Sequence, residues 1–182
     1  MTQHASTHIE GVTIAAAGAR FGVKGADAAA LLLQRGLRIP MQPNRVIHWH
    51  GSDTLGSGRC LRQGNSEFLV ELDAAPQKPL AIDDAIPRAW TLIRADHCLL
   101  LHGPQWPAAL AHVCSFDFER LQAEPDLVVM TLLAGIGVTV IREPSPAGLA
   151  LRLWCDPGFA TYLQQCLHTI SEYAAPANEG SR

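Results

Sequence analysis

Two histidines, His48 and His50, stand one residue apart in the stretch VIHWHG and could supply two ligands to a metal ion. Side chains alternate along a strand, so both would point to the same side of an extended segment. No third ligand is marked by its spacing, and an edge strand that carries two polar residues also explains the pattern. We favour the edge strand and predict no metal site.

A second candidate for chemistry is a thiol beside a carboxylate, in the stretch CSFDFERL that begins at Cys114. Cys114 follows Leu110 by four residues, which places it on the apolar face of the preceding predicted helix, where a thiol is inert. The chain has five cysteines, with no CxxC pair and no Cys/His cluster of zinc spacing. We therefore predict buried, reduced thiols, which are typical of a cytoplasmic protein.

The stretch LLLHGPQWPAALAHVC raises the question of a phosphate-binding loop at Gly103 and Pro104. A phosphate loop needs several glycines or the pattern GxxxxGK[ST], and neither is present. Gly103 instead permits a sharp turn from a strand into a helix, and Pro107 suits the first turn of that helix. The sequence predicts a turn here and no nucleotide site.

The elements around this turn occur twice along the chain. With an offset of 78 residues, RFGVKGADAAALLLQRGLRIP (20–40) aligns with 98–114, so that Gly25 meets Gly103 and Leu32 meets Leu110. In the first copy, Asp27 is a candidate N-cap and Gly36 a candidate helix end. Strand, glycine and helix thus form an internal repeat.

Each copy continues into a predicted hairpin, at 59–73 and at 137–154, and then into a predicted helix. The second of these helices has Asp156 as N-cap and an apolar stripe at helical spacing. The residues of the stripe are Phe159, Leu163, Cys166, Leu167 and Ile170.

These elements predict an α+β fold of two pseudo-repeated βαββα modules, with mainly antiparallel sheets and helices packed outside. The segments are a flexible N-terminal segment (1–17), one domain (18–173) with modules of about 18–90 and 91–173, and a disordered tail (174–182). The first module's final helix is predicted at 79–90.

Composition limits the partners that the chain can have. The formal net charge is −3, which excludes a basic surface for nucleic acid, and no apolar run is long enough to cross a membrane. Only 17% of the residues are charged and 48% are hydrophobic, which predicts exposed apolar surface and a protein partner, or self-association of the isolated chain. Trp49, Trp90 and Trp106 are interface candidates. The alternative is that alanine inflates the hydrophobic count and that the tryptophans lie in the core.

Several of these stretches resemble one family. RADHCLLLHGPQWPAALAHVCSFDFERL (94–121) is similar to the central segment of the glycine-cleavage T-protein superfamily, which has a folate-binding fold. LRQGNSEFLVEL (61–72) resembles a Leu-Gly-Pro-Asp-Glu-Trp-Leu hairpin of the gamma subunit of heterotetrameric sarcosine oxidase, with Asn65 and Ser66 in place of Pro-Asp. GADAAALLLQRGLRIP and GFATYLQQCL resemble that gamma family too. The resemblance covers about residues 18–170.

The resemblance implies tetrahydrofolate as a candidate cofactor, and T-proteins use it to transfer a one-carbon unit. Their catalytic aspartate lies on a Gly-Gly-x-x-Asp-Asp hairpin, whereas the matching stretch here, AGIGVTVIRE, has no carboxylate before Glu143. Without that acid we assign no catalytic residue. Asp117 matches an Asn-Asp step of the superfamily, although a cap or turn at the helix end explains it better.

Arginine outnumbers lysine twelve to two, and arginine pairs well with carboxylates such as those of a folate-type ligand. Arg45, Arg59 and Arg62, with Asp117, are therefore the candidate folate contacts. An acidic partner surface or codon usage alone also explains the arginines, and we favour these two explanations.

Two functions from different classes follow. The first is a non-catalytic gamma-type subunit of a cytoplasmic sarcosine-oxidase-like flavoenzyme, bound to its larger flavoprotein subunits in the metabolism of one-carbon and methylamine compounds. The second is a stand-alone folate-binding or aminomethyltransferase-like protein.

Overall fold

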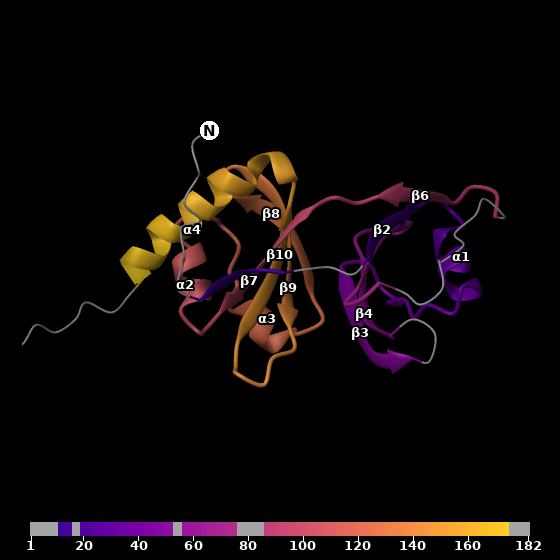
Figure 1. Cartoon of the computed structure of the whole chain (residues 1–182), viewed down its shortest axis with the longest axis horizontal. Coiled ribbons are helices and arrows are strands. Elements are labelled where there is room, and N and C mark those ends of the chain that lie inside the picture. Colours follow the sequence, from indigo (N-terminus) through magenta and orange to yellow (C-terminus); the bar gives the residue numbers. More distant parts are fainter. Residues whose placement is uncertain (1–10, 16–18, 53–55, 76–85, 175–182) are drawn as a thin grey trace, which may run out of the picture. The chain divides into compact units, whose positions relative to one another are not determined.

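The computed structural model describes residues 11–15, 19–52, 56–75 and 86–174, and the chain divides into two compact units. The N-terminal unit comprises the described residues of 16–96 together with 124–130, and the C-terminal unit comprises the remainder. Each unit is built on a five-stranded sheet with antiparallel pairing and carries few helices (Figure 1). The predicted α+β class with mainly antiparallel sheets is confirmed.

The sheet of the N-terminal unit has the strand order β3-β4-β5-β2-β6, with one helix, α1 (Ala28–Gln34), after β2. Its strands are β2 (Ala19–Lys24), β3 (Arg45–Ser52), β4 (Gly56–Arg62), β5 (Glu67–Leu72) and β6 (Trp90–Ile93). The predicted hairpin at 59–73 is the β4–β5 pair.

The turn from β2 into α1 depends on Gly25, whose φ of +121° is a conformation that side chains oppose. A Cβ at this position would overlap the carbonyl oxygen of Arg88. The predicted cap by Asp27 is wrong, because its carboxylate accepts hydrogen bonds from the Arg88 guanidinium instead, at 2.8 and 3.0 Å. The helix ends at Gly36 as predicted, in a left-handed conformation with φ +76°.

The core of the N-terminal unit lies between α1 and one face of the sheet. Leu31 and Leu32 of the helix pack with residues at alternate positions of the strands, among them Cys60, Phe68 and Val70. The residues between them, such as Arg59, Leu69 and Glu71, therefore lie on the opposite face of the sheet.

The sheet of the C-terminal unit has the order β1-β7-β10-β9-β8. Its strands are β1 (Val12–Ile14), β7 (His97–His102), β8 (Val128–Leu133), β9 (Ile136–Glu143) and β10 (Ala150–Cys155). Its helical elements are α2 (Trp106–Leu110), α3 (Arg120–Ala123), the 3₁₀ turn η1 (Pro157–Phe159) and α4 (Ala160–Ala174). The predicted hairpin at 137–154 is the β9–β10 pair. Residues 128–130 of β8 belong to the N-terminal unit.

The C-terminal helix begins as predicted, because the Asp156 carboxylate accepts a hydrogen bond of 2.7 Å from the Gly158 N–H. Leu163, Leu167 and Ile170 form its buried stripe. Phe159 was predicted to belong to this stripe, and that is wrong: it lies in η1, before α4 begins, and is exposed.

Other expectations need correction. Strand β1 lies within the segment 1–17 that was predicted to be flexible, and β8 was not predicted. Of the predicted helix at 79–90, residues 79–85 lie outside the described residues, and the rest contains no helix but the start of β6. Residues 175–182 of the predicted tail also lie outside the described residues.

The tryptophans divide between core and surface. Trp49 and Trp106 are buried, so the prediction that they contribute to an interface is wrong. Trp90, on β6, is 59% exposed and remains available. No helix in the described part of the chain is long and apolar enough to cross a membrane.

The two sheets share one strand order. Taken in chain order, the strands β2 to β5 and β7 to β10 occupy the same positions in their sheets. The fifth strand differs in its place along the chain, because β6 follows the other strands of its sheet and β1 precedes those of its own. Gly25 and Gly103 have φ of +121° and +117° and follow the matched strands β2 and β7. This similarity supports the internal repeat, whose residue-by-residue superposition, Gly25 on Gly103 and Leu32 on Leu110, stays a prediction.

Candidate functional site

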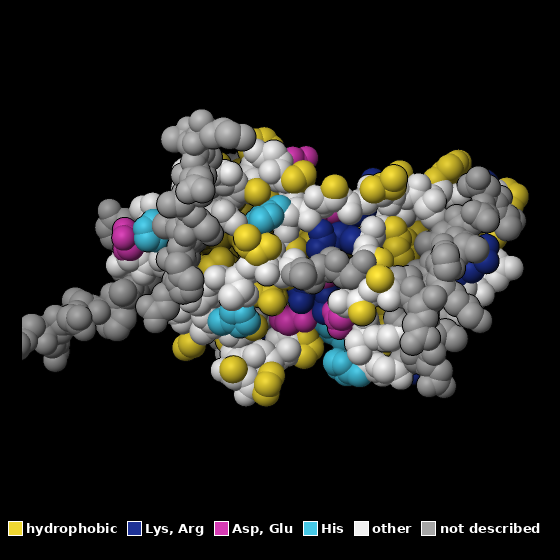
Figure 2. All heavy atoms as spheres, in the orientation of Figure 1, with side chains coloured by type: hydrophobic (Ala, Val, Ile, Leu, Met, Phe, Trp, Pro, Cys, Tyr) yellow, Lys and Arg dark blue, Asp and Glu magenta, His cyan; other side chains and the backbone are white. Residues whose placement is uncertain are grey.

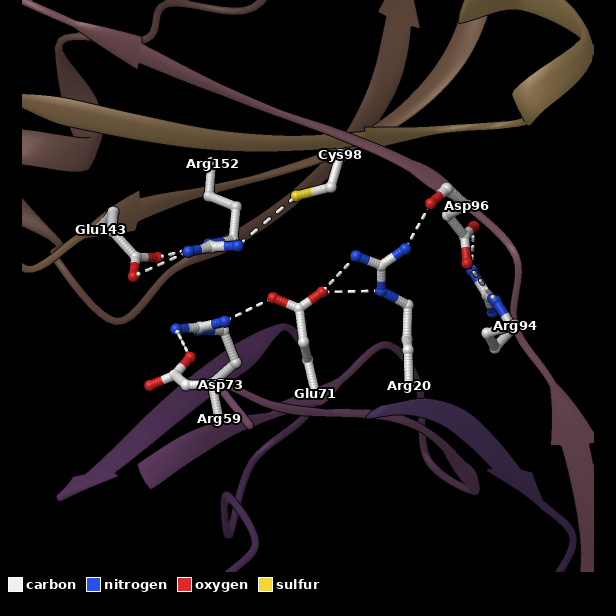
Figure 3. Close-up of polar contacts among 9 residues, drawn as sticks. All are labelled: Arg20, Arg59, Glu71, Asp73, Arg94, Asp96, Cys98, Glu143 and Arg152. Carbon is white, nitrogen blue, oxygen red and sulfur yellow. Dashed lines mark hydrogen bonds and ion pairs between the residues drawn. The ribbon is translucent and has the colours of Figure 1, made fainter. Parts of the chain in front are cut away.

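A row of charged side chains crosses three neighbouring strands of the N-terminal unit. In the sheet register, Glu71 of β5 lies opposite Arg20 of β2 on one side and opposite Arg59 of β4 on the other. All three lie on the face of the sheet away from α1 and point toward one another (Figure 3). The sheet register itself therefore assembles an arginine–glutamate–arginine cluster.

The contacts in this cluster are short and buried. The Arg20 Nε and Nη2 atoms lie 2.6 and 2.5 Å from Glu71 Oε2, and Arg59 Nη1 donates to Glu71 Oε1. The side chain of Glu71 is 0% exposed, and those of Arg20 and Arg59 are 7% and 5% exposed. A buried charge needs this kind of compensation.

Two further carboxylates extend the row at its ends. Asp73 accepts from Arg59 Nη2 at 2.7 Å, and the Asp96 backbone oxygen accepts from Arg20. The Asp96 side chain forms two hydrogen bonds with Arg94, of 2.7 and 2.9 Å. Burial alone would raise the pKa of Asp96, but the hydrogen bonds and the charge of Arg94 hold that pKa below its ordinary value.

These contacts decide what the cluster can do chemically. Both oxygens of Glu71 already accept hydrogen bonds from guanidinium groups, so neither oxygen faces a place where a substrate could bind. Three arginines face three carboxylates, so the row is neutral. It is a structural ion network, which we call the Glu71 network.

The C-terminal unit has a smaller cluster of the same kind. Arg152 of β10 binds Glu143 of β9 with two hydrogen bonds, of 2.8 and 3.2 Å, and donates to the Cys98 sulfur at 3.5 Å (Figure 3). Its guanidinium carbon also lies 5.9 Å from the centre of the Trp154 ring, a cation–π distance. Glu143 is the first carboxylate on the strand where T-proteins are expected to carry an acid, and here an arginine neutralises it.

The predicted folate contacts lie at separate places, each with partners of its own. Arg45 Nη1 binds Glu124 and Asp126, both at 3.1 Å. Arg59 belongs to the Glu71 network. Arg62 donates to backbone oxygens of the β4–β5 turn and to that of Met41, which precedes β3, at 2.6 Å. Its guanidinium carbon lies 5.4 Å from the centre of the Phe68 ring.

Asp117 is exposed and accepts a hydrogen bond of 3.0 Å from the Glu119 N–H, as expected of a turn residue. The folate role of Arg45, Arg59, Arg62 and Asp117 stays a prediction.

The histidines and cysteines carry no site among the described residues. His48 and His50 lie on β3, an edge strand as expected, and no group of three or more potential ligands in the described part of the chain could hold a metal ion. All five cysteines are free. Cys114 is half-buried and lies beyond the end of α2, so its predicted place on the buried face of the helix is wrong.

Sequence reasoning missed most of the Glu71 network. A signal was present, since Arg20 and Glu71 each stand between two apolar residues of a strand, and a charge that is buried in such surroundings requires a partner. The sequence alone does not show which strands become neighbours, so the partners of these two charges could not be identified.

The two antiparallel five-stranded sheets and the few helices define an α+β fold. No family model and no curated protein sequence matches the chain. A chain of the heterotetrameric sarcosine oxidase from Corynebacterium sp. U-96, solved in complex with pyrrole 2-carboxylate, is similar with a TM-score of 0.71 and 20% identity. The match covers 93% of this chain and 87% of that one.

A second similar structure is the glycine cleavage system aminomethyltransferase T from Bartonella henselae, with a TM-score of 0.64 and 14% identity. That match covers 86% of this chain and 44% of the aminomethyltransferase, so the chain spans less than half of its length. The expected T-protein-like fold is confirmed.

Proposed function

We propose that the chain is a non-catalytic, gamma-type subunit of a heterotetrameric sarcosine-oxidase-like flavoenzyme. In this role it binds and stabilises the larger flavoprotein subunits, which oxidise a methylated amine or amino acid. The observation that carries the proposal is mutual coverage: the fold matches a chain of a heterotetrameric sarcosine oxidase over 93% of its own length and 87% of the other. The match to the aminomethyltransferase leaves more than half of that protein without a counterpart.

The chemistry of β9 supports a non-catalytic role. Val138, Val140 and Ile141 are buried apolar side chains, and Glu143, the only acid on this strand, forms a two-point ion pair with Arg152. An acid in such a pair cannot take a proton from an amine without losing its partner. The five free thiols support a cytoplasmic location.

The test is purification of the full chain, with an affinity tag, from its source cells. We expect larger polypeptides that carry flavin to co-purify, and the complex to consume oxygen when sarcosine or a related N-methyl amino acid is added. Purification of the chain alone, without flavin or oxidase activity, would contradict the proposal.

The alternative is a stand-alone folate-binding or aminomethyltransferase-like protein, favoured by the match to the aminomethyltransferase over 86% of this chain. Its candidate contacts are Arg45, Arg59, Arg62 and Asp117. Arg45 and Asp117 are the more useful to test, because Arg59 is buried in the Glu71 network and Arg62 binds backbone oxygens.

Titration of the purified chain with tetrahydrofolate, followed by calorimetry, separates the two functions. Tight binding of tetrahydrofolate that Arg45→Gln weakens, together with transfer of a one-carbon unit from an aminomethyl donor, would favour the stand-alone protein over the subunit. Loss of such transfer in Asp117→Asn would identify the acid.

A further inference from the structure

Strand β6 is an edge strand of four uncharged residues, Trp-Thr-Leu-Ile, and all four are exposed. Trp90 is 59% exposed and Ile93 is 97% exposed. Apolar side chains lie at the surface over this part of the N-terminal unit (Figure 2). A long-lived protein seldom leaves an apolar edge strand uncovered, because such an edge pairs readily with other chains.

The exposure of β6 is two-sided. Its register with β2 places Leu92 opposite Gly22 and Ile93 opposite Phe21, so neighbouring side chains of β6 point to opposite faces of the sheet. Trp90 and Leu92 lie on one face, and Thr91 and Ile93 lie on the other. In the described part of the chain, no strand pairs with the outer edge of β6.

The other edge of the same sheet shows how this protein covers an edge strand. Beside β3, the turn that precedes β8 forms a single bridge between Arg45 and Leu127. The Val46 N–H donates to the Asp126 oxygen at 2.8 Å, and the Val128 N–H donates to the Asn44 oxygen at 2.9 Å. The segment also brings Glu124 and Asp126 to Arg45. One edge thus has a neighbouring segment bonded to its backbone, and β6 has none among the described residues.

The form of the missing neighbour follows from the two-sided exposure. A helix laid against β6 would cover only one of its faces, together with only one pair of its side chains. An added strand would cover the side chains of both faces at once and would also bond to the backbone of the free edge. The complementary neighbour is therefore an extended segment with apolar side chains on both of its faces.

A second copy of this chain is a poor neighbour for this edge. Four strand residues span only about 13 Å, and two such strands bury far less than the roughly 800 Å² per partner of a stable interface. A partner that adds contacts beyond the strand satisfies the area requirement.

We propose that β6 binds an extended, apolar segment of a larger subunit by strand addition, so that this segment becomes the sixth strand of the N-terminal sheet. The inference rests on the proposed subunit function and specifies its interface. It requires no covalent step and no cofactor.

The test uses the tagged full chain in its source cells, with the photo-crosslinking residue p-benzoylphenylalanine in place of Thr91. After irradiation of the purified complex, we expect a crosslink to a segment of a larger subunit with apolar residues on both faces of a strand. A crosslink only to a second copy of this chain would overturn the proposal.

Ile93→Lys provides a second measurement. Because Ile93 is almost fully exposed, the variant should keep its urea midpoint but recover the larger subunit at least about tenfold less well. Met41→Lys, at another exposed apolar residue of the same unit, is the matched control and should change recovery less than about twofold.

Unchanged recovery with Ile93→Lys would overturn the strand addition while the subunit function stands. If the unaltered chain recovers no larger subunit at all, the proposed function fails, and this inference fails with it.

Discussion

The N-terminal and C-terminal units have the same strand order, but they compensate buried charge in different ways. In the N-terminal unit one glutamate on the middle strand serves two arginines, so three strands depend on a single carboxylate. In the C-terminal unit one arginine serves one glutamate on the neighbouring strand, and a sulfur atom and an aromatic ring complete its surroundings. A shared topology therefore fixes which strands meet, while the side chains at each register position decide how much stability rests on one residue.

The largest expected effect on stability comes from removal of the Glu71 carboxylate. Glu71→Gln removes the negative charge that the buried Arg20 and Arg59 share, and we expect it to lower the free energy of unfolding by about 3–5 kcal/mol. Glu143→Gln removes a less buried carboxylate, which is 15% exposed and pairs with one arginine in place of two, and should cost less. Urea unfolding of both variants measures the two effects.

Replacement of all three members, with Arg20→Met, Glu71→Leu and Arg59→Leu together, is the control. Because an apolar set of similar volume needs no counter-charge, it should recover much of the stability that Glu71→Gln removes. Equal losses in Glu71→Gln and Glu143→Gln would contradict the difference between the units.

The turns at Gly25 and Gly103, which follow the matched strands β2 and β7, provide the next comparison. At Gly25 a Cβ would meet the backbone of Arg88, whereas at Gly103 it would meet only the flexible side chain of Gln105. We expect Gly25→Ala to cost about 2–4 kcal/mol and Gly103→Ala about 1–2 kcal/mol, the latter from the positive φ alone. Thermal unfolding of the pair is the measurement, and a reversed order would show that the two turns are not related as the repeat implies.

A smaller effect concerns the pH dependence of the Glu71 network at its outer end. The pKa of Asp96 is lowered in the folded state, so its contribution is fully present above the unfolded value of about 4 and is lost as the pH falls through the folded value. Asp96→Asn should therefore cost about 1 kcal/mol at pH 7 and much less at pH 3. Asp27→Asn, at the more exposed pair with Arg88, is the control and should cost about 0.5 kcal/mol or less. A cost for Asp96→Asn that does not change with pH would count against the Arg94 pairing.

The labelling rates of the thiols compare the two units without any substitution. Burial raises the pKa of Cys60, the one cysteine of the N-terminal unit, to about 12, so this thiol should resist labelling from pH 7 to pH 9 until the protein unfolds. Cys114 and Cys166 of the C-terminal unit are half-buried and should react first. Mass spectrometry after a short exposure to a maleimide gives the order, and early labelling of Cys60 would show that its unit opens more easily than its packing indicates.

The sequence predicted the features that are local. Gly25, Gly36 and Asp156 each act within one turn, so the ends of α1 and the start of α4 could be predicted from neighbouring residues. Strand β8 was missed because Met130 and Leu132 are apolar and exposed, which removes the alternation that marks a half-buried strand. The Glu71 network could not be assembled in advance, since Arg20 and Glu71 meet only through the pairing of strands 51 residues apart.

Strand β1 has a consequence for the order in which the protein can form during synthesis. Thr13 of β1 hydrogen-bonds with His102, the last residue of β7, across 89 positions of the sequence. At about 5–20 residues per second, the ribosome delivers β7 roughly 4–18 s after β1. By then it has already delivered all five strands of the N-terminal sheet, which end at Ile93. Strand β1 thus waits for its partner while the N-terminal sheet becomes complete, and the sheet that contains β1 closes after a sheet whose strands all follow β1 in the chain.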